Sequence, residues 1–196
     1  MSEIMLSAVN TRQKIMNAAL LVTAKDGFEK ATTNRISRTA GVSEGIIYHY
    51  FKNKYDLCHN MIKEGAEEFR RCLMKEIDKY ADPKEKLNKL IDFHFEYFTG
   101  KSSIFKVIFG RGADTSIMME NILKIAIIPY SRIIETLIKQ GIKEGEFKNL
   151  CPRITALNLL GMMQLPAIAL HFESEKFSAH AARENVKNIF IGGLLR

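Results

Sequence analysis

The side chains best suited to molecular recognition in this 196-residue chain are grouped between positions 43 and 54. That segment combines a histidine, two lysines and several hydroxyl groups around one glycine, in the order Ser43-Glu44-Gly45-Ile46-Ile47-Tyr48-His49-Tyr50-Phe51-Lys52-Asn53-Lys54. Hydroxyl, amide and ammonium groups donate hydrogen bonds to phosphate oxygens, and a histidine can donate to an acceptor on a base edge. The residue types therefore indicate binding to nucleic acid.

The rest of the sequence gives little support for enzymatic catalysis. We find no nucleophile next to a base, no phosphate-binding loop and no cluster of metal ligands in the sequence. Glu67 and Glu68 are adjacent and project from different sides of a helix, which makes them a poor acid–base pair. The three cysteines, Cys58, Cys72 and Cys151, lack Cys-x-x-Cys spacing and are interpreted as small buried hydrophobes in a reducing cytoplasm. We therefore expect a protein that is not an enzyme and that needs no cofactor or metal.

The recognition segment is predicted to contain the second of two short helices. Residues 33–40 and 44–50 have helical patterns, and Gly41 supplies a tight turn between them. Thr33 and Ser43 are the residues expected to cap the two helices. Two helices joined in this way form a helix-turn-helix, whose second helix can enter a major groove of DNA.

Helical geometry divides the second helix into an inner and an outer face. Ile47 and Phe51 are four residues apart and set the inner face. The opposite face holds Gly45, Ile46 and His49, so this face is free to contact base edges. His49 can donate to a base acceptor, Ile46 can touch a thymine methyl group, and the glycine allows close backbone approach.

The residues around this face suit the sugar–phosphate backbone. Tyr48, Tyr50, Lys52 and Lys54 surround it, and the next helix begins here, where free backbone N–H groups can hold a phosphate. Several of these residues also have a simpler interpretation. Glu44 can merely complement the helix dipole, since DNA repels a carboxylate unless it meets a cytosine amino group. Tyr50 can be a packing residue, and the two lysines can be ordinary solvated side chains.

This part of the chain resembles the N-terminal DNA-binding domain of the tetracycline-repressor-like (TetR) transcriptional regulators. The resemblance rests on residues in a fixed order: Arg12, Ile15, Ala18, Ala19, Asp26-Gly27-Phe28, Thr33, Ile36-Ser37, Ala40-Gly41-Val42-Ser43, Gly45, Tyr48-His49-Tyr50-Phe51 and Lys54-Tyr55-Asp56-Leu57. Ser37 departs from the family's usual alanine but is nearly as small. The resemblance implies base readout by Glu44, Gly45, Ile46 and His49, and backbone contacts by Thr33, Tyr48, Tyr50 and Lys54.

The whole chain is predicted to be helical, because apolar residues recur at three- and four-residue spacing and alternating strand-like runs are absent. The predicted helices span 9–26, 33–40, 44–50, 54–80, 83–99, 102–110, 115–145, 152–172 and 177–195. Asp82-Pro83 marks a helix start, whereas Pro129 and Pro166 are expected to kink or break their helices. The expected fold class is all-α, with an N-terminal three-helix helix-turn-helix DNA-binding domain at 1–55 and a larger helical ligand-binding and dimerisation domain at 56–196.

The composition fits a folded protein of the cytoplasm. With 46% hydrophobic and 26% charged residues, the chain is typical of a globular protein and not of a disordered one. No stretch approaches the roughly 18 uninterrupted apolar residues of a membrane span, and the start lacks a secretory signal. The formal net charge of +7 suits a polyanionic partner, yet residues 1–55 and 81–196 each carry a net +4.

The middle of the chain is rich in Phe, Ile, Leu and Met, and the TetR resemblance implies that its helices enclose an effector pocket. Helix 83–99 has two apolar faces, so it either lies at the centre of a bundle or lines a cavity. The candidate pocket residues are Phe93, His94, Tyr97, Phe105, Phe109, Met118, Met119, Ile122, Tyr130 and Gln164. Each of them can equally be a core residue. Such a pocket would favour apolar or aromatic small molecules.

Helices 152–172 and 177–195 look like the dimerisation pair of the TetR family. The candidate interface residues are Leu157, Leu160, Gly161, Leu165, Ile168, Val186, Ile189, Phe190 and Gly193. A two-fold homodimer would present two reading helices to the two half-sites of a palindromic operator in double-stranded DNA. The alternative is that these residues form only an intramolecular core.

Together these features predict a ligand-responsive transcriptional regulator, specifically a repressor that a small effector releases from its operator. The effector would act by changing the tilt of helix 54–80, which requires different effector affinities for two states. The alternative is a TetR-like co-activator or protein-binding adaptor without specific DNA binding. The basic residues around the reading helix and the glycine at position 45 favour DNA.

Overall fold

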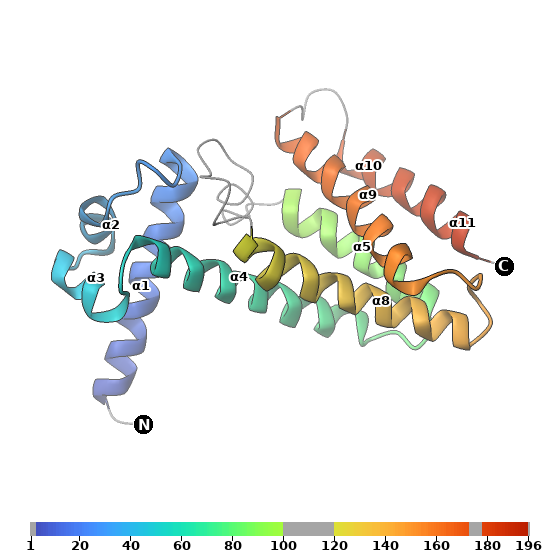
Figure 1. The fold of residues 1–196 in the computed structure, drawn as a ribbon, viewed down its shortest axis with the longest axis horizontal. Helices are drawn as coiled ribbons and strands as arrows, with labels where there is room; N and C mark the ends of the chain where they lie inside the picture. Colours follow the sequence, from blue (N-terminus) through green and yellow to red (C-terminus); the bar gives the residue numbers. More distant parts are fainter. Residues whose placement is uncertain (1–2, 100–119, 173–177, 196) are drawn as a thin grey trace. The chain divides into compact units, whose positions relative to one another are not determined.

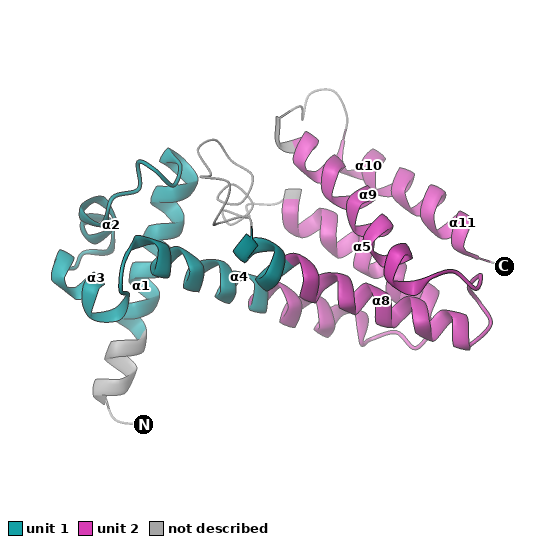
Figure 2. Cartoon of the chain, viewed as in Figure 1, with its two compact units in different colours: residues 1–67, 103–126 teal, residues 68–102, 127–196 magenta. Residues whose placement is uncertain are grey.

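The computed structural model describes residues 3–99, 120–172 and 178–195. Over these residues the chain is helical, and its only β pairing is an isolated bridge between Phe147 and Leu195. The chain forms two compact units, residues 1–67 with 103–126 and residues 68–102 with 127–196 (Figures 1 and 2). The division lies inside the long helix α4 (Lys54–Ile77), further along the chain than the boundary expected at residue 55.

The first unit contains α1 (Glu3–Asp26), α2 (Thr33–Ala40), α3 (Glu44–Tyr50) and the first part of α4. α2 packs against both α1 and α3. Apolar side chains from these helices and from the loop after α1 are buried at its centre: Ile15, Ala19, Phe28, Ile36, Ile47, Phe51 and Leu57. The predicted helix-turn-helix is confirmed, and α2 and α3 have the predicted bounds.

Local backbone chemistry sets the turn between α2 and α3. Thr32 caps α2, because its hydroxyl accepts a hydrogen bond from the Arg35 backbone N–H at 3.3 Å. The prediction that Thr33 caps this helix is therefore wrong by one residue. Ser43 occupies the N-cap position of α3 without a side-chain cap bond. Gly41 ends α2 with a φ of 68°, a left-handed conformation that other residues adopt only with strain.

A polar clasp around Arg12 joins α1 to α4 within the first unit. The guanidinium donates to the Glu64 carboxylate and, at 3.0 Å, to Asn60 Oδ1. The same group lies 5.3 Å from the centre of the Phe51 ring, a distance suited to a cation–π contact. Because Phe51 directly follows α3, the clasp holds the end of α3 against α1 and α4.

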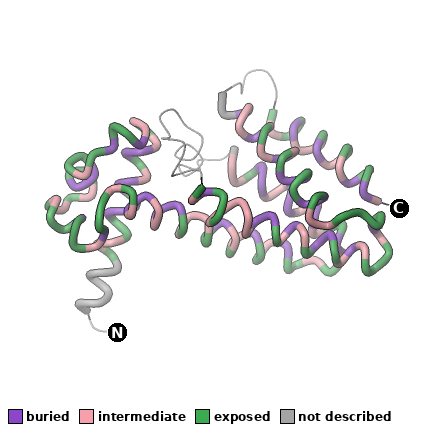
Figure 3. Tube along the Cα trace, viewed as in Figure 1, coloured by how far each residue is buried: buried purple, intermediate pink, exposed green. Residues whose placement is uncertain are grey.

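The second unit consists of the end of α4 and the helices α5 (Pro83–Thr99), α8 (Ile128–Lys143), α9 (Pro152–Phe172) and α10 (Ala179–Val186), then a π-helical turn η2 (Lys187–Ile191) and α11 (Gly192–Leu194). α9 packs against α5, α8 and α10, and α5 also packs against α8 and α10. The buried faces of these helices (purple in Figure 3) meet in one core that includes Leu73, Leu87, Leu90, Ile91, Phe95, Ile134, Ile138, Leu159 and Met163.

Capping explains why α5 begins where the sequence predicted. Asp82 Oδ1 accepts hydrogen bonds from the backbone N–H groups of Lys84 and Glu85, at 2.6 and 3.1 Å. This capping aspartate precedes a proline in the first turn of the helix, where a missing N–H does no harm. α5 and α9 both have their predicted bounds.

The two internal prolines have different consequences. Pro129 lies in the first turn of α8, which directly follows a π-helical turn η1 (Leu123–Ile127), so the helix is locally irregular there but is not broken. Pro166 lies inside α9, which continues to Phe172 without a break. The predicted helix at 102–110 and the predicted start at residue 115 lie outside the described residues.

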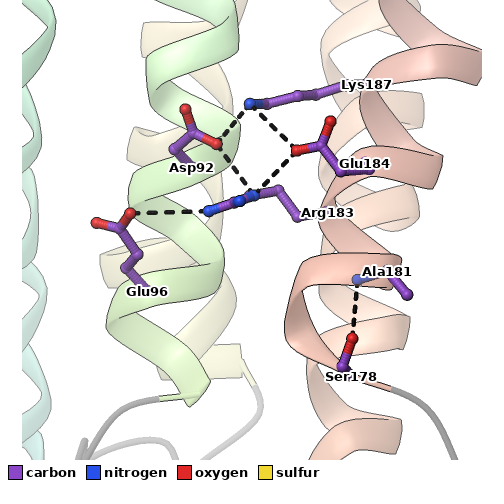
Figure 4. Close-up of polar contacts among 7 residues, drawn as sticks. All are labelled: Asp92, Glu96, Ser178, Ala181, Arg183, Glu184 and Lys187. Carbon is purple, nitrogen blue, oxygen red and sulfur yellow. Dashed lines mark hydrogen bonds and ion pairs between the residues drawn. The ribbon is translucent and has the colours of Figure 1, made fainter.

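Charged side chains join α5 to the C-terminal helices (Figure 4). Asp92 Oδ1 lies 2.5 Å from Lys187 Nζ and 3.3 Å from Arg183 Nε. Glu184 also approaches both cations, and Glu96 lies 3.9 Å from Arg183 Nη1. The side chains of Asp92 and Lys187 are only 21% and 19% exposed, so solvent screens this network less than an ordinary surface pair.

Among the described helices, α9 alone has the length and hydropathy of a membrane span, with a mean hydropathy of 1.3 over Pro152–Leu170. However, 39% of this stretch is buried inside the protein, and the helix packs against three others. A core helix of a helical bundle has the same composition.

Candidate nucleic-acid interface and ligand site

α3 exposes the face that the sequence assigned to DNA. Ile47 is only 1% exposed and points into the first unit, where Phe51 is also buried. On the opposite side Gly45, Ile46 and His49 are exposed, Ile46 to 38%. A glycine, an isoleucine and a histidine on one free helix face can approach base edges in a major groove.

Glu44 is engaged by residues of α2. Thr33 Oγ1 donates a hydrogen bond to Glu44 Oε1, and Asn34 Nδ2 lies 3.4 Å from Glu44 Oε2. The Tyr48 hydroxyl lies 3.3 Å from Thr33 Oγ1. Two of the hydroxyls that the family resemblance assigns to the DNA backbone are thus linked to one carboxylate. The sequence did not single out Asn34, although its position directly after Thr33 was the available signal.

The two lysines beside α3 lie in different environments. Lys52 is exposed, and its backbone N–H donates to Asp56 Oδ2 at 2.9 Å. Lys54 Nζ instead donates to the backbone oxygens of Phe28 and Glu29, at 3.1 and 3.4 Å, and lies 4.2 Å from the Phe28 ring centre. The ammonium of Lys54 therefore stabilises the loop after α1 and is less available to a phosphate than that of Lys52.

Tyr50 is half-buried, and its ring meets that of His49 edge-on, with 5.1 Å between the ring centres. The packing interpretation that the sequence left open for Tyr50 therefore has support. The same contact restricts the orientation of His49, the residue best suited to donate to a base.

In the second unit, aromatic rings gather around Phe69 of α4. The ring centres of Phe93, Tyr97, Phe98 and Tyr130 lie 4.9 to 5.4 Å from that of Phe69. Such distances are typical of offset and edge-to-face contacts. Phe93, Tyr97 and Tyr130 are predicted pocket residues. Phe69 was missed because the pocket was sought only in the helices after residue 83, whereas Phe69 lies in α4.

His94 lies beside this cluster and is completely buried. Its Nδ1 lies 3.4 Å from the Tyr130 hydroxyl, and its ring centre lies 4.7 Å from that of Phe98. Burial lowers the pKa of His94 to about 3, although the nearby Met163 backbone opposes that shift, so the imidazole is neutral. Burial also raises the pKa of Tyr130 well above its usual range. No atom of the described residues forms a hydrogen bond of good geometry with His94 Nε2.

Gln164 of α9 contributes a second buried polar atom, because its Nε2 has no hydrogen-bond partner within the described residues. A buried donor without a partner destabilises a protein unless a ligand or water satisfies it. Ile122 is buried too, but it belongs to the stretch that groups with the first unit. Four further pocket candidates lie outside the described residues: Phe105, Phe109, Met118 and Met119.

The predicted interface residues of α9 and the C-terminal helices are unequally exposed. Leu157, Leu165 and Ile189 are 39%, 69% and 60% exposed. Gly161 and Gly193 are exposed as well, Ile168 and Phe190 are half-buried, and Leu160 and Val186 are buried within the protomer itself. The last two therefore serve the protomer's own core.

An open, mainly apolar groove of about 720 Å³ runs between α9 and α10. Its lining residues are Gly161, Met162, Leu165, Pro166, Ala169, Ala181, Ala182, Asn185 and Val186. Small side chains dominate this list, so another helix can approach the groove closely.

The cysteines and the acidic residues form no metal site in the described part of the chain, where no three potential ligands gather. Cys58 is buried, which raises the pKa of its thiol to about 12 despite the nearby Lys54 ammonium. Cys72 is half-buried, and its Sγ lies 3.2 Å from Glu68 Oε1. Cys151 is exposed, so the expectation that all three cysteines are buried is wrong for this residue.

Two family models match the chain in the order expected from the fold. The model for bacterial regulatory proteins of the tetR family matches residues 15–61, and the model for the tetracyclin repressor-like C-terminal domain matches residues 80–167. The first match contains α2 and α3, and the second contains α5, α8 and most of α9.

Similar proteins include regulators of fatty acid metabolism. The fatty acid metabolism regulator protein of Bacillus subtilis (strain 168) is 26% identical over 182 residues, which cover 92% of this chain and 94% of that protein. The crystal structure of FadR from Bacillus subtilis in complex with stearoyl-CoA has a TM-score of 0.84 at 27% identity, covering 92% of this chain and 98% of that one.

The structure of the fatty acid degradation regulator FadR from Bacillus halodurans has a TM-score of 0.83 at 25% identity, covering 95% of this chain and 97% of that one. Both family models, the helix-turn-helix and the helical second unit agree on one assignment. This chain belongs to the TetR family of bacterial transcriptional regulators, so it is a DNA-binding regulator and not an enzyme.

Proposed function

We propose that this regulator is a cytoplasmic homodimer that binds a palindromic operator through α3 and that a long-chain acyl-CoA releases it. The observation that carries the effector class is the likeness to fatty-acid regulators over 92% of the chain, one of them solved in complex with stearoyl-CoA. This proposal narrows the apolar or aromatic effector expected from sequence to a long acyl chain.

The composition of the first unit supports α3 as the reading helix. Its exposed face offers Gly45, Ile46 and His49 to base edges, while Tyr48 is 53% exposed beside them and Lys52 is free to reach a phosphate. The Arg12 clasp holds this helix rigidly, and a rigid frame improves the precision of contacts made by exposed side chains.

The aromatic cluster of the second unit supports an acyl effector. Phe69, Phe93 and Tyr97 form an apolar cluster of side chains, whose chemistry suits contact with a hydrocarbon chain. The His94 ring and the Gln164 side-chain amide are buried polar groups of the same unit, and each can form a hydrogen bond with a carbonyl oxygen. A thioester carbonyl provides such an acceptor next to an apolar chain.

The exposed apolar face of α9 and η2 supports the dimer. Leu157, Leu165 and Ile189 are large side chains that water contacts in the single chain, and Leu165 also lines the groove between α9 and α10. A second copy related by a two-fold axis would bury this face, and a two-fold dimer suits an operator whose half-sites lie about one turn of DNA, roughly 34 Å, apart.

α4 offers a route for the response, because residues of both units belong to this one helix. Phe69 of α4 contacts the aromatic side chains of α5 and α8, so an acyl chain that moves these rings would also move α4. We propose that the DNA-bound and ligand-bound states differ in the position of this helix, with acyl-CoA binding the second state more tightly.

The test begins with a duplex selected by the full-length protein from a randomised pool. Its affinity is then measured by fluorescence anisotropy with stearoyl-CoA, with octanoyl-CoA and with free coenzyme A. We expect stearoyl-CoA to weaken the affinity by about 5- to 150-fold, the usual range of allosteric coupling, and coenzyme A to change it less than about twofold. An unchanged affinity with stearoyl-CoA would refute the effector, and failure to select any sequence would refute operator binding.

A further inference from the structure

In the hydrogen-bonded cluster of Glu44 with Thr33, Asn34 and Tyr48, the chemistry of the groups decides which atom donates in each hydrogen bond. An ionised carboxylate only accepts, so the single hydroxyl hydrogen of Thr33 is committed to Glu44 Oε1. Tyr48 must then be the donor across the 3.3 Å that separates its hydroxyl from Thr33 Oγ1. Thr33 and Asn34 therefore donate to the Glu44 carboxylate, and Tyr48 donates to Thr33.

These donors are of the kind that contacts DNA phosphates. Hydroxyl and amide side chains make a large share of protein–phosphate hydrogen bonds. Thr33 is half-buried, and Asn34 and Tyr48 are exposed, so a phosphate can reach all of them. In the free protein the Glu44 carboxylate accepts hydrogen bonds from Thr33 and Asn34, and a phosphate oxygen is an acceptor of the same kind.

We propose that Glu44 is a specificity-determining residue that competes with DNA phosphates for Thr33, Asn34 and Tyr48. On most sequences, a carboxylate displaced by a phosphate stays beside the polyanionic backbone without a partner, which is unfavourable. At a cytosine, the N4 amino group donates to it in the major groove, and the displaced carboxylate is stabilised again. Glu44 therefore weakens the affinity for arbitrary DNA. It weakens the affinity less for an operator whose cytosine lies where its N4 amino group can donate to the displaced carboxylate.

This inference rests on the proposed role of α3 as the reading helix, and it is tested with Glu44→Gln in the full-length dimer. The substitution keeps the shape of the side chain and removes its charge. The matched control is Glu29→Gln, which removes an exposed charge from the same unit outside this cluster. Thermal unfolding of both variants verifies that they fold.

The first measurement compares the dissociation constants for a mixed-sequence 30-base-pair duplex and for the duplex selected by the wild-type protein. We expect Glu44→Gln to bind the mixed-sequence duplex about tenfold more tightly, on the scale of one charge-assisted hydrogen bond, and the selected duplex no more tightly. Glu29→Gln should change both alike, by less than about twofold. An equal effect of the two substitutions, or an unchanged ratio between the two duplexes, would overturn the inference.

The second measurement is a double-mutant cycle with Thr33→Val, which removes the hydroxyl that Glu44 holds. If the carboxylate acts by occupying this donor, Glu44→Gln tightens binding much less in the Thr33→Val background. Additive effects would mean that Glu44 only repels DNA through its charge. Selective DNA binding by the wild-type protein is measured independently of these variants. A failure of the proposed operator binding and a failure of the proposed role of Glu44 are therefore distinguishable.

A repeated selection identifies the base concerned. The wild-type protein should enrich a cytosine at one fixed position of each half-site, and Glu44→Gln should lose that preference while it keeps the remaining consensus. A wild-type consensus that places no cytosine within reach of α3 would contradict the proposed exchange of partners.

Discussion

The reading helix and the aromatic cluster differ in where their functional groups lie. In α3 the groups suited to DNA are exposed, with Ile46 at 38% and Tyr48 at 53%, and the core is made by other positions of the same helix. In the second unit Phe69 is 6% exposed and His94 is fully buried, so the proposed ligand groups are also core groups. Recognition and stability are therefore separable in the first unit and coupled in the second.

The largest expected effect is that of Phe69→Ala. This ring contacts four others, and removal of a buried phenylalanine ring lowers the free energy of unfolding by about 3 to 5 kcal/mol. Urea unfolding measures the loss, and calorimetry with stearoyl-CoA measures binding by the same variant. If Phe69→Ala is as stable as the wild-type protein and has lost only acyl-CoA binding, the aromatic cluster is not part of the core. Recognition and stability would then not be coupled in the second unit.

An intermediate effect is expected from pH, through His94. The pKa of His94 is about 3 in the folded protein and near 6.5 in the unfolded chain, so the unfolded state binds more protons between these values. The contribution of the neutral, buried His94 to the free energy of unfolding is complete above pH 6.5. As the pH falls below that value, the free energy of unfolding decreases by up to about 1.4 kcal/mol per pH unit.

Urea unfolding of the wild-type protein at pH 7, 6 and 5 measures this slope. His94→Gln should abolish it, whereas His49→Gln on the exposed face of α3 should retain it. If the free energy of unfolding depends on pH equally in the wild-type protein and both variants, His94 is not the group that causes this dependence.

The smallest effect is expected from His49→Ala. Its side chain is exposed, so unfolding should be almost unchanged, while each half-site loses one base contact worth about 1 kcal/mol. Anisotropy with the selected duplex measures the affinity, and a mixed-sequence duplex is the control for loss of general DNA binding. Equal weakening on both duplexes would assign His49 to the backbone instead of to a base.

The same contrast explains what could be predicted from sequence. The bounds of α2, α3, α5 and α9 follow from caps, glycines and helical periodicity, all of which act within a few residues. The exposed face of α3 follows from helical geometry once Ile47 is known to be buried. The cap of α2 was assigned to the wrong residue, because the adjacent Thr32 and Thr33 both fit the pattern. They differ in contacts that the sequence does not show: Thr32 accepts from the Arg35 N–H, whereas Thr33 donates to Glu44.

Contacts between distant residues were beyond the sequence patterns. Lys54 donates to the carbonyl oxygen of Phe28, 26 positions earlier, and no local pattern indicates that. Phe69 belongs to the aromatic cluster because residues of α5 and α8, distant from it in the sequence, contact its ring. Periodicity predicts an apolar stripe on the C-terminal helices, but it does not show that Leu160 and Val186 point into the protomer's own core.

The division of labour between the two units is tested most directly by hydrogen–deuterium exchange of the full-length protein with the selected duplex and, separately, with stearoyl-CoA. The account predicts that the duplex slows exchange mainly in residues 33–50. It predicts that stearoyl-CoA slows exchange mainly in residues 83–99 and 128–143, where α5 and α8 carry the aromatic rings. Protection of residues 33–50 by stearoyl-CoA, without any protection in α5 or α8, would contradict it.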